Sequence, residues 1–217
     1  MSRYELAVFD LDGTLLDTGR GVLSAVRYTV KELGLEMPDE DTLKTFIGPP
    51  IQDSFARTYG FEGPVLQDIA TVFRNFYSTK TLLEADLYEG ISELFEAICE
   101  RGIKPAVATY KREDYAVKLL KHFGFDKYTD IMYGGDHENK LKKQDIIEKC
   151  IVSAGISDIS KVVMIGDTVF DAVGAEKIGA DFIGVSYGYG FKTLDDIKEV
   201  KSIGGARRAI DILNYFN

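Results

Sequence analysis

The chain has 217 residues, 45% of them hydrophobic, which is enough to bury a substantial core in one domain or in a domain with a smaller insert. Its formal net charge of -9 argues against nucleic acid or an anionic membrane as the main partner, because both favour a basic surface. Cys99 and Cys150 form neither a metal-ligand spacing nor a disulfide framework, and no apolar stretch reaches membrane-spanning length. These features predict a soluble, cytoplasmic protein.

The first predicted element is a buried strand at residues 4–9, and acidic residues follow it directly. Asp10 and Asp12 stand two positions apart, and the period of two in a strand places such a pair on the same side. Because neighbouring carboxylates repel each other, keeping both ionised requires a cation, and hard oxygen ligands favour Mg²⁺. Gly13 permits a tight turn that the hydroxyl of Thr14 can hold. Taken alone, the pattern also fits an ordinary strand end followed by an Asp12-Gly13 turn.

Residues 16–85 carry helical patterns and almost no strand signal. Apolar periodicity and turn residues predict four helices: one over residues 22–33 that ends at Gly34, a short one capped by Asp39 that ends near Phe46, one that begins at Pro50, and one over residues 66–76. An all-helical block after the first strand indicates a second small domain, with chain crossings at residues 15–18 and 83–90. We expect Asp17, at the first crossing, to serve as a hinge or as a helix cap.

Beyond residue 85, short strand patterns alternate with amphipathic helices. The expected strands cover residues 103–108, 131–133, 162–165 and 182–185. This alternation predicts a doubly wound α/β core, in which helices cover both faces of a parallel sheet.

Two of these strand ends lead into residues that suit a phosphate group. Thr109 follows the strand at residues 103–108 and offers a hydroxyl and backbone N–H groups, and Lys111 follows at once. A lysine directed at the same sheet edge would neutralise the charge on a transferring phosphoryl group. The candidates are Lys140, Lys142 and Lys143, which precede an amphipathic helix. Each also fits a solvent-exposed position, and Lys143 is the best candidate because it stands at the start of the helix.

The strand at residues 162–165 ends in Gly166 and Asp167, and Asp171 follows four positions later. Open α/β sheets bind their ligands at the carboxyl ends of the strands. We therefore expect Asp167 to add a carboxylate to the metal site and Asp171 to hold a neighbouring cation or a metal-bound water. The competing interpretation of Asp171 is a helix residue that faces the positive end of the helix dipole.

Four motifs thus follow strand candidates in order: DLDGT at residues 10–14, TYK at 109–111, Lys143, and GDTVFD at 166–171. Together they resemble the four motifs of the haloacid dehalogenase-like hydrolase superfamily. The helical insert after the first motif resembles the small helical cap of that superfamily, so the resemblance covers essentially the whole chain.

The resemblance implies a Rossmann-like α/β core domain at residues 1–15 and 86–217 and a helical cap domain at residues 16–85. Two shorter stretches, IGPP at residues 47–50 and GVSYGYG at 184–190, are similar to the phosphoglycolate phosphatase-like branch.

The resemblance also implies a role for each motif residue. Asp10 would attack phosphorus and form an aspartyl-phosphate, which splits one difficult displacement into two. Asp12 would protonate the leaving oxygen and later deprotonate the hydrolytic water. Mg²⁺ would be held by the carboxylates of Asp10 and Asp167 and by the backbone carbonyl of Asp12. The implied phosphate-binding residues are Thr109, Tyr110 and Lys143, and the supporting positions are Gly13, Gly166 and Asp171, the last of which would support Lys143 or the water shell of the metal.

The sequence departs from the superfamily pattern at two places. A small polar residue often follows the threonine of the second motif, whereas this chain has Tyr110, which we expect to narrow the site or to contact a leaving group. The third motif lacks the Lys-Pro form of many relatives, so the choice of Lys143 over Lys140 or Lys142 is a judgement.

The best-supported function is therefore a Mg²⁺-dependent phosphatase that hydrolyses a small phosphorylated metabolite. A sugar-phosphate mutase is the main alternative, since it can use the same Asp10 and Asp12. A receiver-type phosphoacceptor domain is disfavoured by Asp12 and by the helical insert, and a catalytically silent binding protein by the full set of acidic motif positions. A dehalogenase would not need Asp12.

We expect the cap to select the substrate, with Gly48 and Pro49 as candidate contacts. A rigid connection between helices is an equally good interpretation of this turn. The charged side chains of Lys44, Arg57 and Arg74 fit either an anionic leaving group or solvent. Glycolate, sugar, nucleotide and pyrophosphate leaving groups stay open, as does a monomeric or dimeric state.

Overall fold

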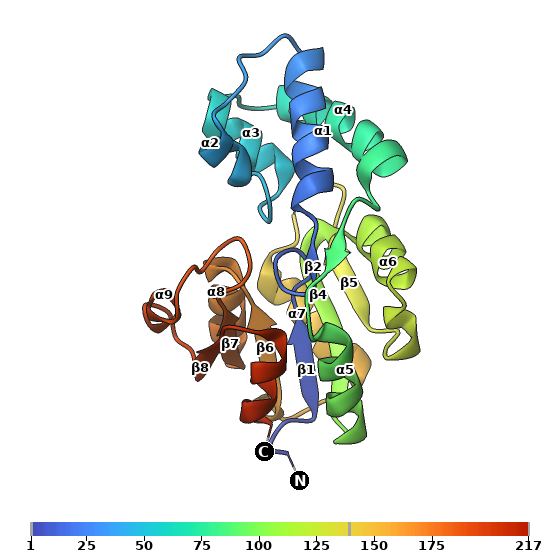
Figure 1. Ribbon diagram of the computed structural model, residues 1–217, viewed down its shortest axis with the longest axis vertical. Coiled ribbons are helices and arrows are strands. Elements are labelled where there is room, and N and C mark those ends of the chain that lie inside the picture. The colour runs from blue at the N-terminus through green and yellow to red at the C-terminus, as the bar shows by residue number, and fades with distance from the viewer. Residues whose placement is uncertain (1, 139, 217) are drawn as a thin grey trace. The chain divides into compact units, whose positions relative to one another are not determined.

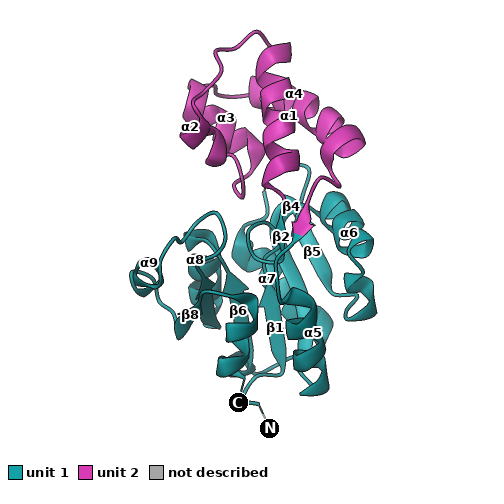
Figure 2. Cartoon of the chain, in the orientation of Figure 1, with its two compact units in different colours: residues 1–17, 87–217 teal, residues 18–86 magenta. Residues whose placement is uncertain are grey.

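The computed structural model describes residues 2–138 and 140–216. The chain divides into two compact units, one formed by the residues up to Asp17 together with those from Leu87 onward, and the other formed by Thr18–Asp86 (Figure 2). Each unit is described by itself below. Within the described part of the chain, no helix combines the length and apolar character needed to cross a membrane.

The first unit is built on a six-stranded parallel sheet (Figure 1). Its strands are β1 (Leu6–Phe9), β4 (Lys104–Arg112), β5 (Met132–Gly135), β6 (Val162–Gly166), β7 (Asp181–Val185) and β8 (Gly204–Ala206), in the order β5-β4-β1-β6-β7-β8. The central strand β1 pairs with β4 and β6, and its last residue Phe9 lies level with Val107 and Ile165. The residues that follow these strands therefore emerge at one edge of the sheet.

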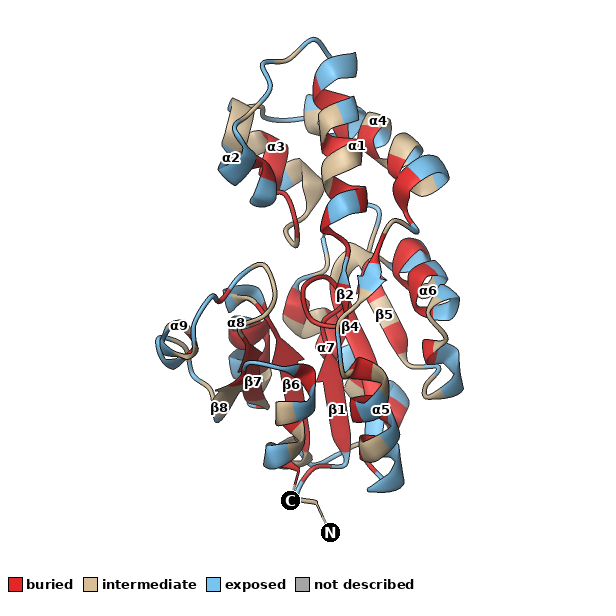
Figure 3. Ribbon diagram, viewed as in Figure 1, coloured by how far each residue is buried: buried red, intermediate tan, exposed pale blue. Residues whose placement is uncertain are grey.

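Helices cover both faces of this sheet. They are α5 (Ile91–Glu100), α6 (Glu113–His122), α7 (Lys143–Ala154), α8 (Val169–Ile178) and the short α9 (Leu194–Lys198), with 3-10 turns η2 (Phe125–Lys127), η3 (Ile159–Lys161) and η4 (Ala209–Tyr215). On one face, Leu6 and Val8 of β1 share a buried cluster with Ile146 of α7 and Ala172 of α8. On the other, the Phe9 ring lies 4.8 Å from the Phe95 ring of α5. The strands are buried on both faces (Figure 3), which explains why their sequences are continuous apolar runs. The predicted doubly wound α/β class is confirmed.

The second unit consists of α1 (Gly19–Glu32), α2 (Glu40–Lys44), α3 (Ile51–Tyr59), α4 (Val65–Phe76) and the π-helical turn η1 (Tyr77–Thr81). These elements confirm the four helices predicted from the sequence, including the cap on α2, where the Asp39 side chain accepts a hydrogen bond of 2.7 Å from the Thr42 N–H. Strands β2 (Leu16–Asp17) and β3 (Asp86–Leu87), which flank these helices in the sequence, form a two-stranded sheet.

Two details differ from the sequence predictions. The strand expected at residues 103–108 runs on to Arg112, because after an irregularity Arg112 again pairs with Gly135 of β5. The helix cap considered for Asp17 is wrong, since Thr18 occupies the N-cap of α1 and the Asp17 carboxylate instead accepts a hydrogen bond from the Tyr189 hydroxyl. The hinge role of Asp17 stays a prediction.

Candidate active site

The carboxyl ends of β1 and β6 bring two of the motif aspartates into one buried region. Asp10 follows β1, and its N–H donates a hydrogen bond of 2.9 Å to the carbonyl of Ile165 on β6. Asp167 follows β6, and both side chains belong to residues that are buried, Asp10 at 6% and Asp167 at 0% exposure. Parallel register alone therefore places residues 157 positions apart in the sequence at one edge of the sheet.

Lys143 is the lysine that reaches these carboxylates. It is the first residue of α7, and its Nζ lies 2.7 Å from Asp10 Oδ1 and 2.7 Å from Asp171 Oδ1, while donating to the carbonyl of Ala108 at 2.9 Å. Burial disfavours its charge, but the carboxylates of Asp10 and Asp171 outweigh burial and raise the pKa of Lys143 above its usual value. The other two candidates lie elsewhere: Lys140 pairs with Glu138, and Lys142 is exposed.

Asp10 and Asp171, the two partners of Lys143, form a cluster of three carboxylates with Asp167. Asp10, Asp167 and Asp171 each offer an oxygen within 4.8 Å of the others, and all three residues are buried. Burial raises the pKa of Asp10 to about 8, although Lys143 opposes the shift, and burial raises the pKa of Asp167 to about 7, with Asp171 adding to it. A divalent cation would offset both the burial cost and the mutual repulsion, so this triad could hold a metal ion.

The orientation of Asp167 is fixed by a loop that follows β7. Its Oδ2 accepts hydrogen bonds from the N–H groups of Tyr189, at 2.7 Å, and Gly190, at 3.1 Å. Gly188 lies so close that a Cβ there would come within 2.4 Å of the same oxygen, and a Cβ on Gly13 would come within 2.3 Å. Gly13 also has a φ of 84°, which favours glycine. These contacts explain why the sequence places glycine in both turns.

Asp171 combines the two interpretations that the sequence left open. Its Oδ2 accepts hydrogen bonds from the N–H of Thr168, at 3.1 Å, and from the Thr168 hydroxyl, at 2.7 Å, which closes the start of α8. Its Oδ1 faces Lys143 at 2.7 Å. A Cβ on Gly166 would lie 2.3 Å from the Asp171 carboxyl carbon, so the glycine of this motif makes room for the side chain.

Asp12 does not join the triad through its carboxylate. Its Oδ1 lies 3.1 Å from Nζ of Lys111, and both side chains are only 7% exposed. The sequence pattern predicts a cation beside Asp10 and Asp12. For the Asp12 side chain, the structure shows that this cation is the ammonium group of Lys111. Sequence reasoning missed this pairing, although Lys111 stands two positions after Thr109 and so at the same-face spacing of a strand. Metal binding by the Asp12 backbone carbonyl stays a prediction.

Thr109 and Tyr110 of the second motif make different contacts. Thr109 is 1% exposed, and its hydroxyl oxygen accepts a hydrogen bond of 3.1 Å from the N–H of Lys111. The hydroxyl of Tyr110 accepts a hydrogen bond of 3.1 Å from the backbone N–H of Lys143. The phenol of Tyr110 is therefore directed at the start of α7, and the expected contacts of these two residues with a phosphoryl or leaving group stay predictions.

The expected substrate contacts Gly48 and Pro49 lie in the turn between α2 and α3 of the helical unit. Gly48 has a φ of 103°, and no heavy atom of a more distant residue lies within 4 Å of the position that a Cβ would take. Among the nearby basic residues, Lys44 pairs with Asp41 at 2.9 Å, and Arg57 donates to the carbonyl of Thr45 at 2.9 Å. Substrate contact by this turn stays a prediction.

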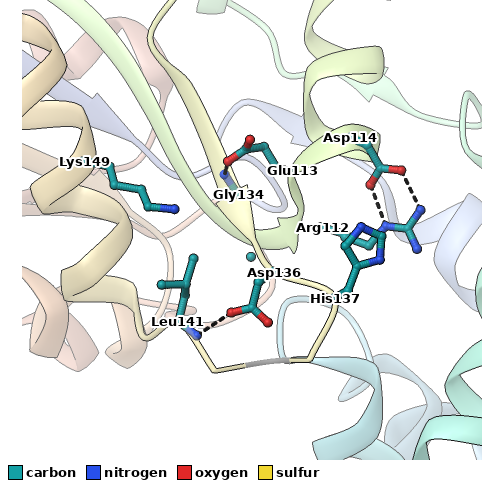
Figure 4. Close-up of a pocket in the computed structure, with 9 residues that line it drawn as sticks. Arg112, Glu113, Asp114, Gly134, Asp136, His137, Leu141 and Lys149 are labelled. Atoms are coloured by element: carbon teal, nitrogen blue, oxygen red, sulfur yellow. Dashed lines mark hydrogen bonds and ion pairs between the residues drawn. The ribbon is translucent and has the colours of Figure 1, made fainter.

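A cavity of about 270 Å³ is lined by the end of β5, the start of α6, the loop before α7 and Lys149 within α7 (Figure 4). Two of the charged side chains that line it make contacts within neighbouring loops. The Arg112 guanidinium is paired with Asp114 at 2.5 Å, and the Asp136 carboxylate accepts a hydrogen bond of 2.7 Å from the N–H of Leu141. These contacts stabilise the loops that lead into α6 and α7, and thereby the segment that carries Lys143.

Comparison with known proteins gives a consistent result. Residues 7–185 match the family model described as haloacid dehalogenase-like hydrolase. A 5'-nucleotidase of Pseudomonas aeruginosa is 35% identical over 87% of this chain and 85% of its own length. A phosphoglycolate phosphatase of Agrobacterium fabrum is 32% identical over 85% of this chain and 81% of its own length.

Relatives with other names, and solved structures, match as well. The tyrosine-protein kinase PtkA of Mycobacterium tuberculosis is 30% identical over 86% of this chain, which spans 63% of that protein. The crystal structure of a "predicted phosphatase" from Clostridium acetobutylicum superposes with a TM-score of 0.89 at 30% identity, covering 97% of this chain and 99% of the other.

Proposed function

We propose that this chain, which belongs to the haloacid dehalogenase-like hydrolase family, is a Mg²⁺-dependent phosphatase that cleaves small phosphate monoesters through an aspartyl-phosphate. The observation that carries the proposal is the buried cluster of Asp10, Asp167 and Asp171 at the carboxyl edge of the sheet, in which Asp10 and Asp171 pair with Lys143. The chain is a phosphatase of that family, and its substrates are small phosphorylated compounds. The finer assignments below are proposals, as is a cytoplasmic location.

In the proposed first step, a carboxylate oxygen of Asp10 attacks phosphorus and the bond to the leaving oxygen breaks. Lys143, at 2.7 Å from Asp10, offsets the negative charge that nucleophile and phosphoryl group bring together. The Thr109 hydroxyl and the backbone N–H groups of its loop would hold the phosphoryl oxygens. Asp10 is buried, which would limit its contact with competing water.

Asp12 is proposed as the acid that protonates the leaving oxygen and as the base that later accepts a proton from the hydrolytic water. Its carboxylate is buried and lies 3.1 Å from Lys111 Nζ, which orients it. Two acidic groups with separate lysine partners can thus serve separate roles, Asp10 as nucleophile and Asp12 as proton carrier.

The residues present fit a divalent cation, because three buried carboxylates lie close together with one ammonium group beside two of them, and the pKa values of Asp10 and Asp167 are raised by burial. Asp10 and Asp167 would hold Mg²⁺ with their carboxylates, together with the backbone carbonyl of Asp12. When bound, Mg²⁺ would neutralise part of the charge on the transferring phosphoryl group.

The helical unit, predicted as a cap at residues 16–85, is proposed to select the leaving group. The names of the relatives suggest nucleoside monophosphates and 2-phosphoglycolate as first substrates to compare. A panel of these with sugar phosphates and pyrophosphate, scored by kcat/KM, would identify the substrate class. Product analysis would expose phosphoryl transfer to a second sugar hydroxyl, which is the mutase alternative, and an assay with ATP and a tyrosine peptide would expose kinase activity.

The metal assignment predicts that purified protein releases phosphate from 4-nitrophenyl phosphate with Mg²⁺ and loses this activity in excess chelator. Mg²⁺ at about 100 times its dissociation constant should also stabilise the protein by about 2.7 kcal/mol, measured as a rise in melting temperature. Asp167→Asn should lose both effects, whereas Asp195→Asn, at an exposed carboxylate outside the triad, should keep both. Undiminished turnover in chelator would exclude the metal-dependent mechanism.

The role of Asp12 predicts a dependence on the leaving group. Asp12→Asn should slow hydrolysis of an alkyl phosphate about 10²- to 10⁴-fold, since protonation of the leaving oxygen is lost. With 4-nitrophenyl phosphate, whose leaving group needs no proton, a burst of nitrophenolate should persist because Asp10 can still attack. Rapid-quench kinetics measure the burst, and an equal loss with both substrates would contradict the proton-carrier role.

A further inference from the structure

A hydrogen bond across a long stretch of sequence joins Tyr110 to the start of the helix that carries Lys143. Tyr110 directly follows Thr109 of the second motif. In the structure the hydroxyl of Tyr110 accepts the backbone N–H of Lys143 at 3.1 Å, across 33 positions of sequence. Tyr110 of the second motif and Lys143 of the third are therefore in direct contact.

The N–H that Tyr110 receives has no partner within its own helix. Lys143 is the first residue of α7, and the first N–H groups of an α-helix find no carbonyl within that helix. The Tyr110 hydroxyl gives this N–H a partner and so fixes the backbone at the first residue of α7.

The rest of the Lys143 side chain is enclosed as well. The Tyr110 ring centroid lies 5.4 Å from Lys143 Nζ, within the range of a cation–π contact. On α8, a Cβ placed on Gly174 would come within 2.8 Å of Lys143 Cγ and 3.0 Å of its Cβ, so the lysine stem lies directly against the glycine. Phe170 packs edge-on against Tyr110, with ring centroids 5.8 Å apart.

We propose that Tyr110 is a positioning residue for the phosphatase reaction, which together with Gly174 holds Lys143 so that its ammonium group meets Asp10 and Asp171. The phenol fixes the lysine backbone, and its ring and the bare face of Gly174 confine the side chain between β4 and α8. This inference rests on the proposed role of Lys143 opposite the phosphoryl group. It assigns Tyr110 the role of holding Lys143 in place, and the expected contact of Tyr110 with a leaving group stays a separate prediction.

Tyr110→Phe tests the hydrogen bond, because it removes one oxygen and keeps the ring. We expect kcat for 4-nitrophenyl phosphate to fall about tenfold, which is the size of one lost hydrogen bond, while KM and the melting temperature stay near the wild-type values. Tyr133→Phe is the matched control. Tyr133 lies on the neighbouring strand β5 and its hydroxyl lies 2.7 Å from the Ser153 hydroxyl near the end of α7, so the change should leave kcat unchanged.

A double-mutant cycle separates positioning from a general structural effect. In a Lys143→Met background, Tyr110→Phe should cause no further loss of kcat, because the lysine through which it acts is absent. A loss that persists in that background, a rise in KM with unchanged kcat, or a wild-type kcat in Tyr110→Phe would each overturn the inference. Failure of the wild-type protein and of Tyr133→Phe to release phosphate would instead refute the proposed function.

Gly174→Ala gives an independent test that does not touch the second motif. Alanine favours a helix interior over glycine, so on propensity alone this change should not weaken α8. Because the new Cβ would displace the Lys143 stem, we expect kcat to fall at least as far as in Tyr110→Phe. Unchanged kcat in a folded Gly174→Ala protein would show that the lysine does not depend on this enclosure.

Discussion

Replacing Asp10 by asparagine should abolish turnover, with a loss in kcat of about 10⁵-fold or more, as expected when a covalent nucleophile is removed. The amide keeps the size of the side chain, and its oxygen can still accept the hydrogen bond from Lys143, but it cannot attack phosphorus. We expect mass spectrometry of acid-quenched protein to detect a phosphoenzyme in the wild type and none in the variant.

The same variant should remain folded. Burial raises the pKa of Asp10 to about 8, which means that the protein environment opposes its negative charge, and a neutral amide avoids that cost. We therefore expect the melting temperature of Asp10→Asn in chelator to equal or exceed that of the wild type. Asp195→Asn, at an exposed carboxylate on α9, is the control for the substitution itself. Full activity in Asp10→Asn would remove this residue as the nucleophile.

Lys143→Met should produce the second large effect, and it should act on both catalysis and stability. Among the ion pairs of the described residues, Lys143 is the one lysine whose ammonium group lies within 4 Å of Asp10 or Asp171. Its removal therefore leaves these buried carboxylates without that cation. Loss of one partner from a buried ion pair costs about 3–5 kcal/mol, and loss of a charge-stabilising group costs about 10²- to 10³-fold in kcat.

Two companion variants make the Lys143 result specific. Lys142→Met removes a neighbouring lysine that is exposed, and it should change neither kcat nor melting temperature. Adding Asp171→Asn to Lys143→Met should recover part of the stability, because it removes one of the uncompensated charges, but it should not recover kcat. A larger catalytic loss in Lys142→Met than in Lys143→Met would move the role by one position.

The sequence predicts the positions of the site better than it predicts their partners. Alternation of strands and helices is a local property, and parallel register then carries Asp10 and Asp167 to one edge without further information. Likewise, the start of an amphipathic helix is visible locally, so Lys143 could be preferred over its neighbours.

Pairings across long sequence distances have no comparable local signal. The Lys111 partner of Asp12, the Tyr110 hydroxyl on the Lys143 N–H, and the Tyr189 N–H on Asp167 each depend on how loops from different strands pack. The extension of β4 to Arg112 has the same origin, since it depends on the neighbouring strand β5. Packing also determines the partners of the acidic residues: Asp171 belongs to the buried triad, while the Asp12 carboxylate pairs with Lys111.

The pairing of β2 with β3 has a consequence for how such a protein can diversify. These two strands carry the chain into and out of the helical unit, and because they are hydrogen-bonded neighbours, the ends of residues 18–86 lie side by side. A segment with adjacent ends can be exchanged for another of different length without stretching its host. Every residue proposed for the chemistry lies outside that segment. Recombination that replaces the segment would therefore change substrate selection and leave the catalytic residues in place.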